Sequence, residues 1–351
     1  MSIAIRSFAK INLGLKIGAL RTDGFHELRT IYQTIALHDV VRVEAGAGEG
    51  IEIRCDDPRV PCDATNTCYK IAERVLKSAD KRSKVVITID KQLSVQGGMG
   101  AASSNAVAAM LGLERALGIE LTPQDKLSIA AEVGSDLPLF LIGGTVLGVD
   151  RGQEVYALQD LPEMALVVVT PPVGVSTPKA FAQWDVLQEL ANITEGLQAA
   201  GYDMGDYALT AGNMTGTIKQ FDQAVYAWWS ETLLSQARPA EGPASGVPAL
   251  GGDRAETPLL DLVRTGIEND FERVVFPEYP ELREVKSVLQ REGARYASLS
   301  GSGSTVYGLF DSVDDAEAAA ERMRAAGRAA VATRTVARAE FWERQLVTGN
   351  W

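Results

Sequence analysis

A glycine-rich stretch with a helix-forming run directly behind it most constrains how this chain can fold. Its sequence is QGGMGAASSN at residues 96–105, and residues 106–117 are mostly good helix formers. Glycine permits positive φ and close backbone approach, and a helix N-terminus offers unpaired N–H groups and a positive dipole end. The stretch has neither the lysine of a P-loop nor the third glycine of a dinucleotide fingerprint. It predicts either an anion cradle that opens a helix or a tight turn that packs a helix against a sheet.

Length and composition narrow the class of protein. A chain of 351 residues exceeds one ordinary core and predicts about two domains. The net charge of -12 argues against a general nucleic-acid surface, although a local cationic pocket remains possible. Three cysteines and two histidines are too few for a disulfide framework or a structural zinc site. No apolar run has the length of a signal peptide or a membrane span. We therefore expect a cytoplasmic protein with no membrane or nucleic-acid partner.

The first half of the chain predicts strands around a helical layer. Residues 3–17 alternate between apolar and polar side chains, which predicts a strand with Lys10 and Asn12 on its polar face. Residues 40–45 and 50–54 have the pattern of a hairpin pair, and residues 65–79 that of a helix. Residues 84–89 predict a strand, so the glycine-rich stretch lies between a strand and a helix. A further helix begins at residues 122–123 and ends near residue 134.

The second half predicts a split β-α-β unit. Strands are expected at residues 164–170, 294–299, 306–310 and 329–336, with helices at 280–291 and 314–326. A flexible turn at residues 300–304 separates two of these strands. Residues 185–235 have a mainly helical pattern, and residues 237–258 are rich in proline, glycine and alanine, as exposed loops are. We place the domain boundary between residues 1–160 and 161–351.

Few side chains are candidates for catalysis or binding, and a purely structural role is an alternative for each of them. Lys10 and Asn12 are suited to bind an anion or a hydroxyl, or to form a solvated strand face. Asp136 follows a helix end, where it is suited to accept a proton from a hydroxyl or to cap a helix. Phe25 and His26 stand together at a turn, where they are suited to grip a planar base or to decorate the surface.

The order of these features resembles the GHMP kinase superfamily and, within it, most closely the family of kinases that act on 4-diphosphocytidyl-2-C-methyl-D-erythritol. The blocks that carry the resemblance lie between residues 9 and 310. They are AKINL (9–13), RTDGFHEL (21–28), the glycine-rich stretch, GSDLPLF (134–140), VSTP (175–178), NDFE (269–272) and SGSG (300–303). The AKINL and DGFH motifs are the specific ones, since glycine-rich loops are shared across the superfamily.

The resemblance implies a fold and a reaction. The fold is a two-domain α+β GHMP kinase fold, with an N-terminal domain like ribosomal protein S5 domain 2 and a ferredoxin-like C-terminal domain. The reaction is the ATP-dependent phosphorylation of the 2-hydroxyl of 4-diphosphocytidyl-2-C-methyl-D-erythritol in non-mevalonate isoprenoid precursor biosynthesis. By likeness, Asp136 is the base, Lys10 stabilises the attacking oxygen, and Asn12 positions the hydroxyl. Such an enzyme is expected to work as a monomer or a homodimer.

The resemblance also assigns binding residues. A backbone cradle is expected to hold the ATP phosphates, with a serine hydroxyl near Mg²⁺, taken as that of Ser103 or Ser104 and assigned first to Ser104. The cradle residues are Gly97, Gly98, Met99, Gly100, Ala101, Ala102, Ser103 and Ser104. Asn66 is placed on the adenine side. Phe25 and His26 grip the cytosine, Phe181 stacks on its other face, and Thr177 contacts the substrate diphosphate.

Three departures from the family pattern leave alternatives open. Phe25 stands where the family usually has tyrosine, and the segment between residues 185 and 260 is longer than usual. Ala101 and Ala102 replace glycines of the cradle, so we expect an altered loop path and weaker ATP binding. The alternatives are another GHMP kinase with a different alcohol substrate and a catalytically silent relative that binds nucleotide.

Overall fold

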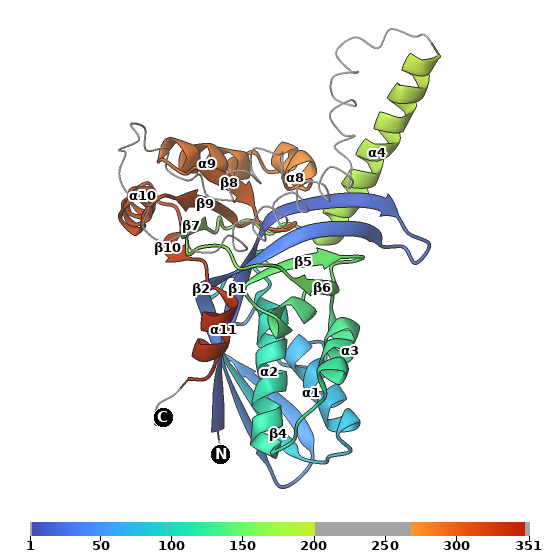
Figure 1. Ribbon diagram of the computed structural model, residues 1–351, viewed down its shortest axis with the longest axis vertical. Helices are drawn as coiled ribbons and strands as arrows, with labels where there is room; N and C mark the ends of the chain where they lie inside the picture. The colour runs from blue at the N-terminus through green and yellow to red at the C-terminus, as the bar shows by residue number, and fades with distance from the viewer. Residues whose placement is uncertain (1, 96, 201–267, 348–351) are drawn as a thin grey trace, which may run out of the picture.

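Two β-sheets organise the parts of the chain that the computed structural model describes, residues 2–95, 97–200 and 268–347 (Figure 1). The first sheet has six strands in the order β3-β4-β2-β5-β6, with β1 paired to β2. These strands are β1 (Ser2–Leu20), β2 (His26–Gly46), β3 (Gly50–Cys55), β4 (Lys84–Asp90), β5 (Thr145–Val149) and β6 (Glu154–Ala157). The predicted strand at residues 3–17 is confirmed and is longer than expected. In Figure 1, β1 and β2 run together as a long two-stranded arm whose hairpin end lies away from the second sheet.

The predicted hairpin between residues 40–45 and 50–54 is wrong. The first segment belongs to β2 and the second to β3, but β4 lies between them. β4 pairs antiparallel with β2 and parallel with β3. Val85, Ile87 and Ile89 of β4 are buried, so inserting this strand removes more apolar surface from water than a hairpin of β2 and β3 would. The β3–β4 connection passes through a helix, as parallel neighbours require.

Two helices pack on one face of the first sheet, and a third packs against the first of them. They are α1 (Thr67–Ser78), α2 (Ala101–Leu117) and α3 (Pro123–Val133), and a short 3₁₀ helix, η1 (Pro138–Leu141), follows. All three were predicted, with Thr122 as the N-cap of α3 and Gly134 at its end. α2 lies very close to the sheet, because a Cβ at Gly112 would stand 2.8 Å from Cγ2 of Val43. This close packing fixes the N-terminus of α2, where the glycine-rich stretch ends.

The second sheet has four antiparallel strands in the order β10-β7-β9-β8. The strands are β7 (Ala165–Val169), β8 (Tyr296–Leu299), β9 (Val306–Phe310) and β10 (Ala330–Arg334), and the helices are α4 (Thr177–Ala199), α8 (Glu272–Glu278), α9 (Pro280–Arg291) and α10 (Val313–Ala325). This strand order is ferredoxin-like and confirms the predicted two-part α+β fold. The boundary at residue 160 stays a prediction. The helix predicted beyond Ala199 and the loop at 237–258 lie outside the described residues.

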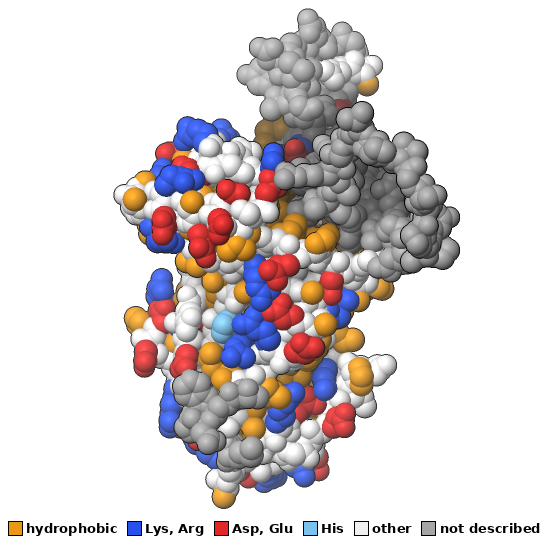
Figure 2. Space-filling model, turned by 60° about the vertical axis from the view of Figure 1, so that its left-hand side comes forward, with side chains coloured by type: hydrophobic (Ala, Val, Ile, Leu, Met, Phe, Trp, Pro, Cys, Tyr) orange, Lys and Arg blue, Asp and Glu red, His pale blue; other side chains and the backbone are white. Residues whose placement is uncertain are grey.

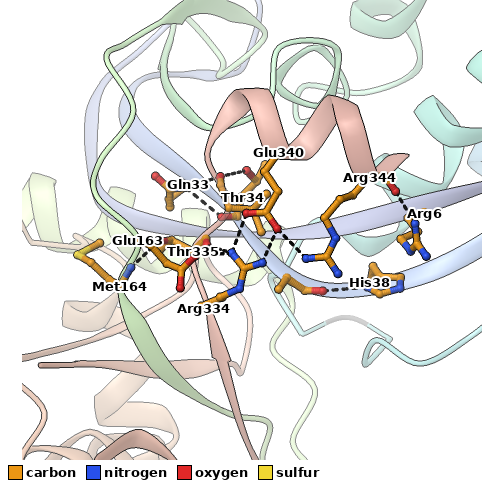
Figure 3. Close-up of polar contacts among 12 residues, drawn as sticks. Arg6, Gln33, Thr34, His38, Glu163, Met164, Arg334, Thr335, Glu340 and Arg344 are labelled. Carbon is orange, nitrogen blue, oxygen red and sulfur yellow. Dashed lines mark hydrogen bonds and ion pairs between the residues drawn. The ribbon is translucent and has the colours of Figure 1, made fainter. Parts of the chain in front are cut away.

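A C-terminal helix that the sequence did not predict joins the two sheets. α11 (Arg338–Gln345) follows β10 and packs Phe341 into the core of the first sheet. Figure 3 shows Glu340 of α11 between Arg334 and Arg344, while Arg6 of β1 donates to the carbonyl of Arg344 at 2.7 Å. The guanidinium of Arg334, and then that of Arg344, lowers the pKa of Glu340 to about 2.

Among the described residues, no helix is long and apolar enough to cross a bilayer.

Candidate active site

Two cavities meet at the glycine-rich loop. The smaller, about 320 Å³, is lined by the loop at residues 97–103 and by Asn66 and Lys91. The larger, about 650 Å³, extends from Lys10 and Asp136 to Phe25, His26 and Phe181. Gly98 and Gly100 line both cavities. A molecule in the smaller cavity can therefore present a group to a second molecule in the larger one across this loop.

The loop depends on glycine at two positions. Gly98 has φ of +84°, and a Cβ there would stand 2.2 Å from the carbonyl oxygen of Ser300. Gly100 has φ of +69°, and a Cβ there would stand 3.1 Å from Cγ of Lys10. Ala101 and Ala102 form the first turn of α2, where negative φ is the rule, so neither alanine needs a positive φ. The expected altered loop path and weaker ATP binding stay predictions. Among the described residues other than glycine, only Asp80 and Asp150 have positive φ.

Of the polar side chains predicted to bind ATP or Mg²⁺, some line the smaller cavity and one does not. Ser103 lines it. Ser104 is buried instead, and its hydroxyl accepts a hydrogen bond from Ser7 at 2.8 Å, so the structure does not bring it to the cavity. Asn66 lies in the cavity wall and caps α1, accepting from the backbone N–H of Cys68 at 2.7 Å and donating to the carbonyl of Pro61 at 2.6 Å. Its side chain thus shapes the wall through contacts within the protein.

Lys10, Asn12 and Asp136 converge at the inner end of the larger cavity. The Nζ atom of Lys10 donates to Oδ1 of Asn12 at 2.6 Å and lies 3.5 Å from Oδ2 of Asp136. Lys10 and Asn12 are both buried on β1, whereas about one third of the Asp136 side chain is exposed. Burial lowers the pKa of Lys10, and the Asp136 carboxylate opposes that shift. The arrangement offers a cation and a carboxylate to one hydroxyl group.

Two residues of β2 that the sequence analysis did not single out complete this group. The hydroxyl of Thr30 accepts from Nδ2 of Asn12 at 2.7 Å and donates to the carbonyl of Gly14 at 2.8 Å. The phenol of Tyr32 donates to Oδ1 of Asp136 at 3.1 Å. Burial, together with the charge of Asp136, raises the pKa of Tyr32 well above its usual value. No sequence motif marked either residue; it is the β1–β2 register of the folded sheet that places Tyr32 opposite Asn12.

The outer end of the larger cavity is aromatic. The ring of His26 stacks on Phe181 with centroids 5.0 Å apart, and its Nε2 lies 2.7 Å from Oδ1 of Asp185. Phe25 is half exposed, and the guanidinium of Arg151 lies 4.8 Å from its ring centroid. The structure therefore brings the three predicted aromatic residues to one cavity. It places Phe181 directly against His26, so a flat ligand can reach only the outer faces of this pair.

A second glycine loop borders both the inner end and the N-terminus of α4. Gly301 has φ of +61°, and its carbonyl accepts from Nδ2 of Asn269 at 2.7 Å. A Cβ at Gly301 would stand 3.3 Å from Oδ1 of Asn12. Thr177, at the start of α4, shares a hydrogen bond of 2.6 Å with Ser302. Thr177 and this loop thus lie in the wall of the larger cavity, between its inner and outer ends.

Sequence comparison places this chain in a known family. Residues 66–144 match the family described as GHMP kinases N terminal domain, and residues 256–329 match GHMP kinases C terminal. A 4-diphosphocytidyl-2-C-methyl-D-erythritol kinase of Acaryochloris marina is 31% identical over 92% of this chain and 91% of its own length. One of the same name from Solibacter usitatus is 33% identical over 87% of this chain and 80% of its own length. The chain belongs to the GHMP kinase family. It is therefore an ATP-dependent kinase of small molecules that phosphorylates an alcohol group.

Solved structures agree with the assignment of this chain to the GHMP kinase family. A crystal structure of 4-(cytidine 5'-diphospho)-2C-methyl-D-erythritol kinase is 26% identical, with a TM-score of 0.66 over 95% of this chain and 99% of that one. Mevalonate kinase of L. major, solved with R-mevalonate, has 16% identity and a TM-score of 0.62 over 95% of each chain, and this likeness concerns the fold alone. The kinase thus shares one fold with enzymes that act on different alcohols, and its own cavity must select the substrate.

Proposed function

We propose that this kinase transfers the γ-phosphate of ATP to the 2-hydroxyl of 4-diphosphocytidyl-2-C-methyl-D-erythritol, a step of non-mevalonate isoprenoid precursor biosynthesis. The observation that carries the proposal is the larger cavity, which joins a lysine–carboxylate group at one end to an aromatic group at the other. That shape suits a substrate with a reacting alcohol at one end and a flat base at the other. The names of the relatives support the same substrate.

In this proposal the inner group performs the transfer. Asp136 accepts the proton of the hydroxyl as the oxygen attacks, and the Lys10 ammonium stabilises the charge that develops on that oxygen. Asn12, held by Lys10 and Thr30, orients the hydroxyl. Phosphoryl transfer depends mainly on alignment and charge stabilisation, so these groups suffice once the γ-phosphate lies in line.

We assign the smaller cavity to ATP. The loop at residues 97–103 lines this cavity and leads into the N-terminus of α2, where a helix offers unpaired backbone N–H groups and the positive end of its dipole, which suits a chain of phosphates. Mg²⁺ is included because nucleotide phosphates supply most of its ligands and it neutralises their charge. Ser103 lines the cavity and supplies the hydroxyl for the metal, a role for which buried Ser104 is less suited. Asn66 shapes the adenine side.

We assign the outer end of the larger cavity to the cytosine. Phe25 stacks on one face of the base, and the His26–Phe181 pair lies on the other side or at its edge. Thr177 and the second glycine loop stand where the substrate diphosphate passes. The proposal includes a cytoplasmic enzyme that is a monomer or a homodimer.

The test is an ADP-release assay with ATP, Mg²⁺ and 4-diphosphocytidyl-2-C-methyl-D-erythritol, with mevalonate and homoserine in parallel. We expect turnover of the cytidyl compound alone. Turnover of another alcohol in its place would contradict the substrate assignment and leave the fold assignment intact. Nucleotide binding without turnover of any of the three would favour the silent relative.

A further inference from the structure

We infer that Tyr32 is a positioning residue of this kinase, which holds the Asp136 carboxylate in the orientation that takes the proton of the alcohol. The inference rests on the proposed role of Asp136. It concerns a residue of β2 that no sequence motif of the site includes. Three independent observations carry it: the hydrogen bond to Asp136, the position of the Lys10 ammonium, and the slot in which the ring is seated.

The first observation is that the two carboxylate oxygens of Asp136 have different partners. The phenol of Tyr32 donates to Oδ1 of Asp136 at 3.1 Å, while Oδ2 lies 3.5 Å from Nζ of Lys10. A carboxylate tied at one oxygen cannot rotate freely about its terminal bond. Oδ2 therefore stays next to the ammonium, where the attacking hydroxyl must also lie to be stabilised by Lys10. The Tyr32 hydrogen bond thus selects which oxygen acts as the base.

The second observation concerns Tyr32 itself, a buried phenol whose ring borders the Lys10 ammonium. Its side chain is 2% exposed, and burial raises its pKa well above the usual value. The phenol therefore stays protonated at neutral pH and does not compete with Asp136 for the proton. The Lys10 ammonium lies 5.5 Å from the ring centroid, so the same ring also borders the cation. One residue contacts both reactive groups.

The third observation is a slot for the ring between two glycines of the β5–β6 hairpin. A Cβ at Gly148 would stand 2.5 Å from Cε2 of Tyr32, and one at Gly152 would stand 2.7 Å from its hydroxyl. Any larger residue at either position would push the ring from its place. Glycine at both positions therefore leaves the space that the ring and hydroxyl of Tyr32 occupy. A ring that only filled the core would not need its hydroxyl end held in this way.

The experiment compares kcat and KM of Tyr32→Phe with those of the wild-type enzyme. Phenylalanine keeps the ring, so the fold is retained and only the hydrogen bond is lost. We expect kcat to fall roughly tenfold, as for a hydrogen bond to a charged group. KM for both substrates should change less than about twofold, because the hydroxyl acts through Asp136. The control is Tyr156→Phe, which removes an exposed phenol of β6 and should leave both constants unchanged.

A second variant tests the slot. Gly148→Ala keeps the phenol but displaces the ring, so its kcat should also fall with KM nearly constant. Unchanged kcat in Tyr32→Phe would overturn the inference. So would a rise in KM for the alcohol with kcat preserved, because that result would make Tyr32 a substrate-binding residue.

A spectroscopic measurement separates this inference from the proposed function. The chain has nine tyrosines, so the ¹³Cζ signal of Tyr32 is the one missing from labelled Tyr32→Phe. We expect this signal to shift in Asp136→Asn, without any turnover being needed. An unmoved signal would refute the hydrogen bond in solution. If the wild type phosphorylates mevalonate or homoserine instead, the substrate proposal fails, and the kcat comparison is made with that alcohol.

Discussion

The inner and outer ends of the larger cavity are built in different ways. At the inner end, Lys10 and Asn12 come from one strand, are almost fully buried and are hydrogen-bonded to each other. At the outer end, His26 meets Asp185 across 159 positions of sequence, and Phe25 is half exposed. A rigid inner end suits chemistry that fails when atoms move by an ångström. A more open outer end, built from an arm and a helix, suits the part of a site that distinguishes one alcohol from another.

The largest expected effect tests the inner end. Replacing Asp136 by asparagine or Lys10 by methionine keeps side-chain volume but removes the base or the cation. We expect kcat to fall by about 10³-fold in either variant. KM for the cytidyl substrate should change little, because the outer end still binds the base. Activity near the wild-type level in both variants would contradict the assigned mechanism and remove the difference between the two ends.

A substitution in the loop between the cavities should have the next largest effect. In Gly98→Ala the new Cβ would stand 2.2 Å from the backbone carbonyl oxygen of Ser300 and 3.0 Å from Cα of Gly303, so the backbone of one loop must shift. We expect KM for ATP to rise roughly tenfold or more, because the loop can no longer aim its N–H groups at the phosphates. Gly327→Ala is the matched control, since Gly327 has φ of +78° with nothing within 4 Å of its Cβ position. It should lower Tm slightly and leave both KM values unchanged. Equal KM effects in the two variants would show general strain instead.

These contrasts also explain what the sequence could and could not predict. Alternation along one strand was enough to place Lys10 beside Asn12, because both lie on the same face. The same pattern could not assign Tyr32, whose partner Asp136 lies 104 positions away and meets it only through the folded sheet. The facing of Ser103 and Ser104 depended on the rotation of α2 about its axis, which packing against Ser7 decides. The wrong hairpin has a similar cause, since β4, 34 positions after the start of β3, takes the place beside β2.

A moderate effect is expected at the outer end. Phe181→Leu keeps an apolar side chain but removes the ring that stacks on His26 at 5.0 Å. An aromatic pair contributes about 0.5–1.5 kcal/mol beyond its buried area, so KM for the cytidyl substrate should rise about three- to tenfold. Steady-state kinetics should show kcat and KM for ATP nearly unchanged. A fall in kcat with constant KM would mean that the two ends are coupled and that the division drawn above is wrong.

The smallest effect concerns Arg151, whose guanidinium lies over the ring of Phe25 at 4.8 Å. A cation–π contact at such an exposed site contributes about 0.5–1 kcal/mol, so Arg151→Met should raise KM for the cytidyl substrate about two- to fivefold. Arg295→Met is the matched control, because it removes the same charge from an exposed ion pair with Asp311 on the second sheet. A rise of equal size in both variants would attribute the effect to net charge. Arg151→Lys sharpens the comparison further: it keeps the charge but loses the planar group, so an intermediate KM is expected if stacking on Phe25 holds that ring ready for the base.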